Sequence, residues 1–156
     1  FKTGLAVAAG LSTGGFDTHG NHDGAHQPLM CNFLYGIDMI MQEIANQGLD
    51  GKVVVCVGSD FGRTPGYNAQ QGKDHWNITS MMFMGPGIAG GKVVGSTDDS
   101  QRANKVNPST LQPDPNGTRI RCEHIQNALR KLAGIADSTP ARKFPISATE
   151  EMPLFT

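Results

Sequence analysis

The sequence has few cysteines, almost no net charge and no long apolar run, and each shortage narrows what the protein can be. Its three cysteines lie far apart without Cys-x-x-Cys spacing and permit at most one internal disulfide. The 13 basic and 14 acidic side chains nearly balance, so the basic surface of a nucleic-acid-binding protein is missing. No stretch approaches the roughly 18 apolar residues that a membrane-spanning helix needs. We therefore expect neither a nucleic-acid partner nor a membrane span.

The length and the glycine content of the chain indicate its domain organisation. A chain of 156 residues suits one domain with a buried core, and its 20 glycines and 9 prolines predict long loops. The chain opens on Phe1 and Lys2 rather than on methionine, so we expect a fragment or a processed product. The expected organisation is one α/β domain over residues 1–136, with residues 137–156 as an extended tail packed on it.

Apolar patterns predict strands that alternate with helices. The first predicted helix is opened by Pro28 and ended by Gly48. A strand, a helix and a second strand within residues 5–57 form a βαβ unit, whose crossover is expected to be right-handed. Residues 97–118 are polar and are expected to cross the surface as a loop. The predicted strands are residues 5–9, 53–57, 80–84 and 92–94, and the predicted helices are residues 28–48 and 122–133.

Polar side chains follow two of these strands at the point where each strand ends. Asp17 and His19 come after residues 5–9 and a glycine-rich turn, and Asp60 comes directly after residues 53–57. The carboxyl ends of parallel strands share one edge of a sheet, where α/β proteins place their sites. Carboxylate oxygen and imidazole nitrogen suit zinc or a similar divalent ion. The sequence therefore predicts a metal-dependent site, to which His75 also contributes.

The histidine-rich segment also has an explanation that involves no metal. The histidines His22 and His26 extend the cluster, which a solvated, histidine-rich loop also explains. Gly20 and Gly24 argue against a helix that would bring three imidazoles to one face, so a tri-histidine site is not predicted.

Each polar residue near the second strand, taken alone, also has an ordinary structural explanation. Asp60 alone is typical of a turn cap, and Arg63 alone of a surface charge, although a guanidinium can hold an oxyanion with two parallel hydrogen bonds. Asp74 can orient the neighbouring imidazole of His75. Their joint placement at strand ends favours a site, in which Asp74 and His22 support the ligands from outside.

The run from Gly85 to Gly90 matches the GxGxxG pattern of dinucleotide-binding loops. Pro86 removes an amide donor, and the residues that follow are predicted to be β rather than helical. We predict a tight turn and no nucleotide cofactor.

Four motifs stand at residues 14–19, 59–65, 74–76 and 87–95. In order and spacing they resemble those of domain-of-unknown-function family 1501, which belongs to the alkaline phosphatase and sulfatase superfamily. The resemblance covers most of residues 5–135 and corresponds to the C-terminal half of such a protein. It implies a three-layer α/β/α fold with a mostly parallel sheet, divalent metals at the sheet's carboxyl edge, and an exported or periplasmic location, because many members carry twin-arginine signals. The motifs are Gly14-Gly15-Phe16-Asp17-Thr18-His19, Ser59-Asp60-Phe61-Gly62-Arg63-Thr64-Pro65, Asp74-His75-Trp76 and Gly87-Ile88-Ala89-Gly90-Gly91-Lys92-Val93-Val94-Gly95.

The resemblance also implies roles for single residues. By position, Asp17 and His19 are similar to the acid and histidine of one metal site, and His75 to its later histidine ligand. The run that contains Asp60 is similar to the superfamily's Ser-Asp-His-Gly, which makes Asp60 a ligand of the other metal. Phe61 departs from that pattern, since a ligand histidine is common there. The superfamily's nucleophile and first acidic ligands belong to the N-terminal half.

These observations together predict a metal-dependent hydrolase of phosphate or sulfate esters, or the C-terminal fragment of one. Its substrate would be a small anionic ester and its metal zinc, with calcium, magnesium or manganese as alternatives. Arg63 would stabilise charge on the transferred group, while the nucleophile would lie outside this chain. The alternative is a non-catalytic exported binding or assembly module that retains the fold, which Phe61 favours. Association with the N-terminal half or with other chains is expected.

Overall fold

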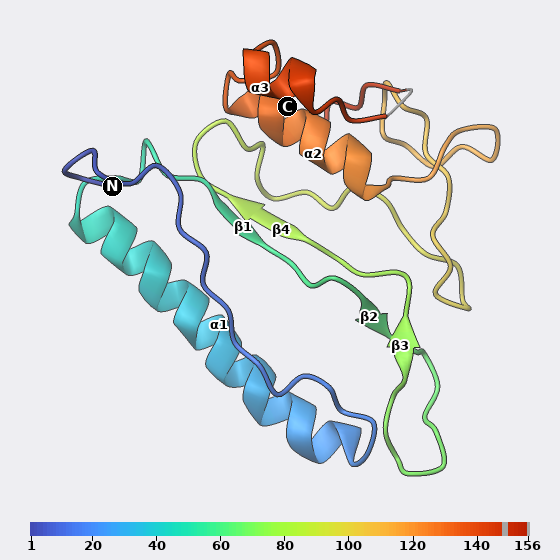
Figure 1. Ribbon diagram of the computed structural model, residues 1–156. Helices are drawn as coiled ribbons and strands as arrows, with labels where there is room; N and C mark the ends of the chain where they lie inside the picture. The colour runs from blue at the N-terminus through green and yellow to red at the C-terminus, as the bar shows by residue number, and fades with distance from the viewer. Residues whose placement is uncertain (148–149, 156) are drawn as a thin grey trace. The chain divides into compact units, whose positions relative to one another are not determined.

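The computed structural model describes residues 1–147 and 150–155, which belong to two compact units, Phe1–Pro86 and Gly87–Thr156. Figure 1 shows their elements in chain order. No helix of the described residues is both long and apolar enough to cross a membrane. The first unit holds α1 (His22–Asn46), β1 (Val55–Val57), β2 (Gly62–Arg63), β3 (His75–Trp76) and β4 (Met82–Met84), and the second holds α2 (Cys122–Leu132) and α3 (Thr139–Lys143).

Helix α1 begins six residues before the predicted start at Pro28 and ends as predicted. This early start corrects the prediction that Gly20 and Gly24 oppose a helix in this segment. Gly24 lies in the first turn of α1, where Asn21 packs within 2.7 Å of the place a Cβ would take. Pro28 lies in the second turn. The helix stops at Gly48, whose φ of 66° allows the Gly48 and Leu49 amides to bond the last free carbonyls of Ala45 and Ile44.

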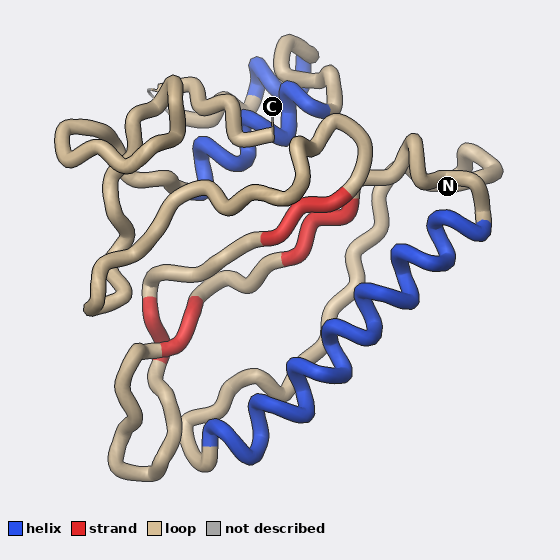
Figure 2. Tube along the Cα trace, turned by 180° about the vertical axis from the view of Figure 1, so that it is seen from behind, coloured by secondary structure: helices blue, strands red, loops and turns tan. Residues whose placement is uncertain are grey.

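One stripe of α1 faces the rest of the first unit. Ile37 is its buried side chain, and Phe33 and Ile40 are partly buried at the spacing that an amphipathic helix requires. Figures 1 and 2 show that the segment before α1 runs back along the helix. Phe16 of that segment places its ring edge-on to Phe33, with centroids 5.8 Å apart.

Two antiparallel ribbons complete the first unit, and they follow each other along the same two chain segments (Figure 2). Strand β1 pairs with β4, with Cys56 opposite Phe83, and β2 pairs with β3, with Arg63 opposite His75. The second pairing closes the loop of residues 64–74, which positions most of the candidate site.

Two predicted strands are wrong. Residues 5–9 are not a strand and lie exposed, with Leu5 91% and Val7 94% accessible, and residues 92–94 are also irregular. An apolar run specifies burial but not a pairing partner, and these two segments form no ladder. The predicted βαβ unit is wrong for the same reason, because its first strand at residues 5–9 does not form. The second and third predicted strands pair with each other antiparallel instead. The three-layer α/β/α fold with a mostly parallel sheet stays a prediction.

The second unit agrees more closely with the sequence. Helix α2 begins at the predicted residue and stops before Gly134, and residues 97–118 form a loop held by isolated bridges at Val106. The predicted extended tail contains the short helix α3, which Ser138 caps by accepting the Ala141 amide. Of this tail, residues 148, 149 and 156 lie outside the described residues, while Met152, Leu154 and Phe155 are buried.

Candidate functional site

Three side chains from two segments of the first unit converge on one point. The Oδ1 atom of Asp17 lies 3.0 Å from Nε2 of His19 and 3.2 Å from Nε2 of His75, and the two Nε2 atoms are 3.1 Å apart. We call these three residues the Asp-His-His triangle. Within residues 1–147 and 150–155, it is the one group of three or more histidine, cysteine or acidic side chains whose ligand atoms gather in this way. All three residues are exposed.

Backbone pairing brings the triangle together. The β2–β3 register sets Arg63 beside His75, while the loop that joins these strands holds the segment before α1. The Lys73 amide bonds the Thr18 carbonyl at 3.0 Å, and Gly20 pairs with Gln71 in an isolated bridge. Residues that are 56 to 58 positions apart in sequence thereby become neighbours.

Arg63 holds the acid of the triangle. Its Nη2 donates to Asp17 Oδ1 at 2.7 Å, and its Nη1 donates to the Lys73 carbonyl at 3.1 Å. The hydrogen bond from Arg63, followed by that from His75, lowers the pKa of Asp17 from 3.8 to about 2. Asp17 is therefore an anion at neutral pH, and Arg63, whose side chain is only 14% exposed, fixes one of its oxygens.

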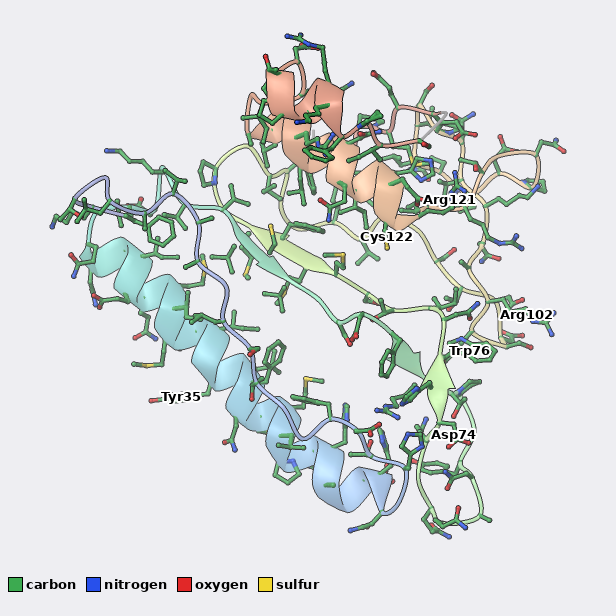
Figure 3. All side chains as sticks on the ribbon, in the orientation of Figure 1. Tyr35, Asp74, Trp76, Arg102, Arg121 and Cys122 are labelled. Carbon is green, nitrogen blue, oxygen red and sulfur yellow. The ribbon has the colours of Figure 1, made fainter. Side chains whose placement is uncertain are left out.

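Asp74 orients His19 rather than its neighbour His75, which corrects the predicted pairing. Asp74 Oδ1 lies 2.9 Å from Nδ1 of His19, and a carboxylate accepts, so Nδ1 is the donor in this contact. Asp17 Oδ1, 3.0 Å from Nε2, competes for the same proton, but Nη1 of Arg63 can only donate and lies 3.5 Å from Nε2, which favours a lone pair on Nε2. The hydrogen bonds from His19 and then Asn68 lower the pKa of Asp74, so this carboxylate is also charged. Figure 3 labels Asp74 beside β3.

Phe61 packs on the third member of the triangle. Its ring centroid is 4.1 Å from that of His75, with the two planes tilted by 31°. The Cζ atom of Arg63 lies 5.5 Å from the same phenyl ring. Phe61 therefore supports two side chains of the site.

The remaining predicted residues lie outside the triangle. His22 contacts Thr18, with Nδ1 2.6 Å from Thr18 Oγ1, and stacks on His26 at 4.5 Å between centroids. Burial, and then the charge of His26, lower the pKa of His22. Asp60 is exposed and does not join the group, and its role as ligand of a second metal stays a prediction.

Sequence reasoning missed two supports of Asp74. Thr64 exchanges bonds with it, since the Thr64 amide donates to the Asp74 carbonyl and the Thr64 hydroxyl accepts the Asp74 amide. Asn68 donates from Nδ2 to Asp74 Oδ1 at 3.0 Å. An asparagine between Gly66 and Gly72 is typical of a turn in which its side chain bonds the backbone, and that signal was available.

The profile of a protein family described as a protein of unknown function, DUF1501, matches residues 4–115, which is more than half of the chain. The chain belongs to the DUF1501 family. No curated protein and no solved structure matches it. The part of this DUF1501 chain that the profile matches contains the whole triangle, Arg63, Asp74 and Asn68, whereas α2 and α3 follow it.

Proposed function

We propose that this DUF1501 chain carries the metal-binding part of a hydrolase that acts on phosphate or sulfate esters. The observation that supports the proposal is the Asp-His-His triangle. Its three ligand atoms are 3.0 to 3.2 Å apart, whereas ligand atoms about 2.0–2.1 Å from a tetrahedral zinc ion lie roughly 3.3 Å from one another. One carboxylate oxygen and two imidazole nitrogens are a donor set that suits zinc. Nε2 of His75 bonds Asp17 in the metal-free chain, and it would release its proton when the ion binds.

The chemical state of the donors also fits a divalent cation. Asp17 is ionised, and the Asp74 contact leaves the Nε2 lone pair of His19 facing the triangle. A partner on the far nitrogen of a ligand histidine is the usual companion of a bound metal. Arg63 shares Asp17 with the cation, because a carboxylate offers two oxygens and about four lone pairs.

A set of three protein ligands suits catalysis rather than a closed structural site, since one position stays open for water or substrate. The Asp17 side chain is 72% exposed, so a substrate can reach that position from solvent. A bound divalent ion supplies polarisation of an ester oxygen and activation of an attacking oxygen.

Arg63 is suited to anion recognition at the same place. Its Nη1 atom lies 3.5 Å from Nε2 of His19, so an anionic group held at the triangle meets a fixed positive charge. The proposed substrate is a small anionic ester, and the proposed nucleophile belongs to sequence outside this chain. Membership of the alkaline phosphatase and sulfatase superfamily, and with it an exported or periplasmic location, extends the resemblance of the four motifs and is part of the proposal.

Zinc retention tests the metal site. The protein and its variants are loaded with zinc, dialysed and assayed for metal content. We expect the unaltered chain and Asp38→Ala, a control that removes an exposed carboxylate of α1, to retain zinc. Asp17→Ala, His19→Ala and His75→Ala are expected to lose it. Asp60→Ala lowers the zinc content only if Asp60 holds a second ion. A parent chain that keeps no zinc overturns the metal site.

Oxyanion binding tests the hydrolase separately from the metal. Isothermal titration of the zinc-loaded protein with inorganic phosphate and with sulfate is expected to give binding that Arg63→Gln weakens. Arg102→Gln, which alters an exposed arginine of the second unit, serves as the control. If zinc binds and neither oxyanion does, the ester hydrolase is rejected while the metal site stands.

A second candidate is a non-catalytic binding or assembly module. The observation that favours it is the extended apolar segment at residues 5–11, in which Leu5, Val7 and Leu11 are 91%, 94% and 80% exposed. Such a segment suits pairing with another polypeptide. Sedimentation of the chain with and without Val7→Lys separates the two candidates, because a module that assembles through this segment dissociates in the variant.

A further inference from the structure

Asn68 is bonded on both ends of its side-chain amide. Its Oδ1 accepts the Gln70 amide at 3.0 Å and the Gly72 amide at 2.9 Å. Its Nδ2 donates to the His19 carbonyl and to Asp74 Oδ1, both at 3.0 Å. The side chain thereby joins its own loop to two residues of the candidate site.

Only one orientation of this amide satisfies all four contacts. Turning it over would set its oxygen against the oxygens of Asp74 and His19, and its nitrogen against two N–H donors. The donors therefore point toward the site and the acceptor toward the loop. The backbone of Asn68 strengthens the arrangement, because its own amide bonds the Gly72 carbonyl at 2.8 Å.

Asp74 depends on this contact for its position. Its side chain is 56% exposed, so water competes for the carboxylate and the free side chain can rotate. Nδ2 of Asn68 and Nδ1 of His19 both lie within 3.0 Å of the same oxygen, Asp74 Oδ1. The Asn68 amide is held by its three other contacts, and it therefore sets that oxygen in front of the imidazole.

We propose that Asn68 is a positioning residue that fixes the tautomer of His19 by holding Asp74 against Nδ1. With the proton kept on Nδ1, Nε2 is the atom that offers a lone pair to the triangle. The effect on the tautomer stands on the contacts alone, whereas its consequence for a metal rests on the proposed function. Loss of a partner that orients a ligand histidine is expected to lower metal affinity about 10- to 100-fold.

The tautomer is read directly by long-range ¹H–¹⁵N correlation spectra of the metal-free protein, at a pH where the imidazoles are neutral. In the unaltered chain we expect the proton of His19 on Nδ1. Asn68→Asp keeps the shape of the side chain and its acceptor oxygen, but it removes both donors and sets a second carboxylate against Asp74. We expect the Nε2-protonated form of His19 to become the major one in this variant.

Two further variants separate positioning from folding. Asn107→Asp adds the same charge to an asparagine of the second unit whose side chain also accepts two backbone amides, so it is expected to leave the His19 spectrum unchanged. Asp74→Ala leaves the turn around Asn68 in place and is expected to give the same tautomer change as Asn68→Asp. It therefore tests the inference even if Asn68→Asp unfolds the loop.

The outcomes are distinguishable from those of the proposed function. A His19 that keeps its proton on Nδ1 in both Asn68→Asp and Asp74→Ala, or that carries it on Nε2 in the unaltered chain, overturns the inference. A tautomer that changes as expected in a protein that retains no zinc supports the positioning role and rejects the metal site. Where zinc binds, its affinity is expected to fall in Asn68→Asp and not in Asn107→Asp.

Discussion

Arg63 and His75 are directly opposite each other in the β2–β3 ribbon, and both side chains reach the same oxygen of Asp17. The guanidinium donates to Asp17 Oδ1 at 2.7 Å, and Nε2 of His75 lies 3.2 Å from it. A single pairing of two strands thus places both hydrogen-bond donors that lower the pKa of Asp17. The candidate site depends on this register, because a slip by one residue would turn each side chain to the other face.

Removing the guanidinium is expected to raise the pKa of Asp17. That pKa is lowered from 3.8 to about 2, and the hydrogen bond from Arg63 is the largest cause. The carboxylate therefore contributes stability above pH 3.8 that is lost as the pH falls through about 2. In Arg63→Gln this contribution is expected to be smaller, and its loss to be complete at a higher pH, because the folded-state pKa rises toward 3.8. Titration of the Asp17 carboxyl carbon by NMR measures it, with Arg102→Gln as the control, and an unchanged midpoint in Arg63→Gln contradicts the prediction.

Gly72→Ala is expected to disrupt the contact between the loop and His19. A Cβ at position 72 would lie 1.9 Å from the carbonyl carbon of His19, and neither backbone can move away cheaply. We expect a loss of about 1–3 kcal/mol in the free energy of unfolding. Gly66→Ala is the matched control from the same loop, because a Cβ there meets no atom within 4 Å. Equal denaturation midpoints for the two variants would contradict the close approach.

Local sequence signals predicted the helices better than the strands. Helix α1 ends at Asn46, just before Gly48, and α2 begins at Cys122, because a stop glycine and apolar spacing act within a few residues. The strands depend on pairing between distant segments, which no local pattern specifies. The apolar run at residues 5–9 therefore predicted a buried strand where the structure has an exposed, irregular segment.

The sequence predicted which residues form the candidate site, but it did not predict the contacts between them. Motif positions grouped Asp17, His19 and His75, and the structure brings these three together. The pairing of Asp74 with His19 follows from the fold of the 64–74 loop, which sequence neighbours do not reveal. Phe61 had been interpreted only as a departure, although its ring supports His75.

Two glycines, one inside α1 and one just after its end, are expected to respond to alanine substitution in opposite directions. Gly48 has a φ of 66°, so Gly48→Ala forces a Cβ into the left-handed region and is expected to cost about 1 kcal/mol. Gly36 lies inside α1, where an added Cβ meets no atom within 4 Å. Gly36→Ala is expected to stabilise the helix by up to about 1 kcal/mol, because alanine is the better helix former. Denaturant unfolding of both variants measures the two changes. A higher free energy of unfolding in Gly48→Ala would rule out the helix stop as described.

Truncating Val7 and Ile37 to alanine tests whether residues 5–9 are packed. Val7 is 94% exposed, so Val7→Ala is expected to change the free energy of unfolding by no more than about 0.5 kcal/mol. Ile37 is 9% exposed in α1, and Ile37→Ala is expected to cost about 2–5 kcal/mol. The three-layer fold needs residues 5–9 as a buried strand, in which Val7→Ala would create a cavity. A loss above about 1 kcal/mol in Val7→Ala would therefore favour the buried strand over the exposed segment, since surface substitutions rarely cost that much.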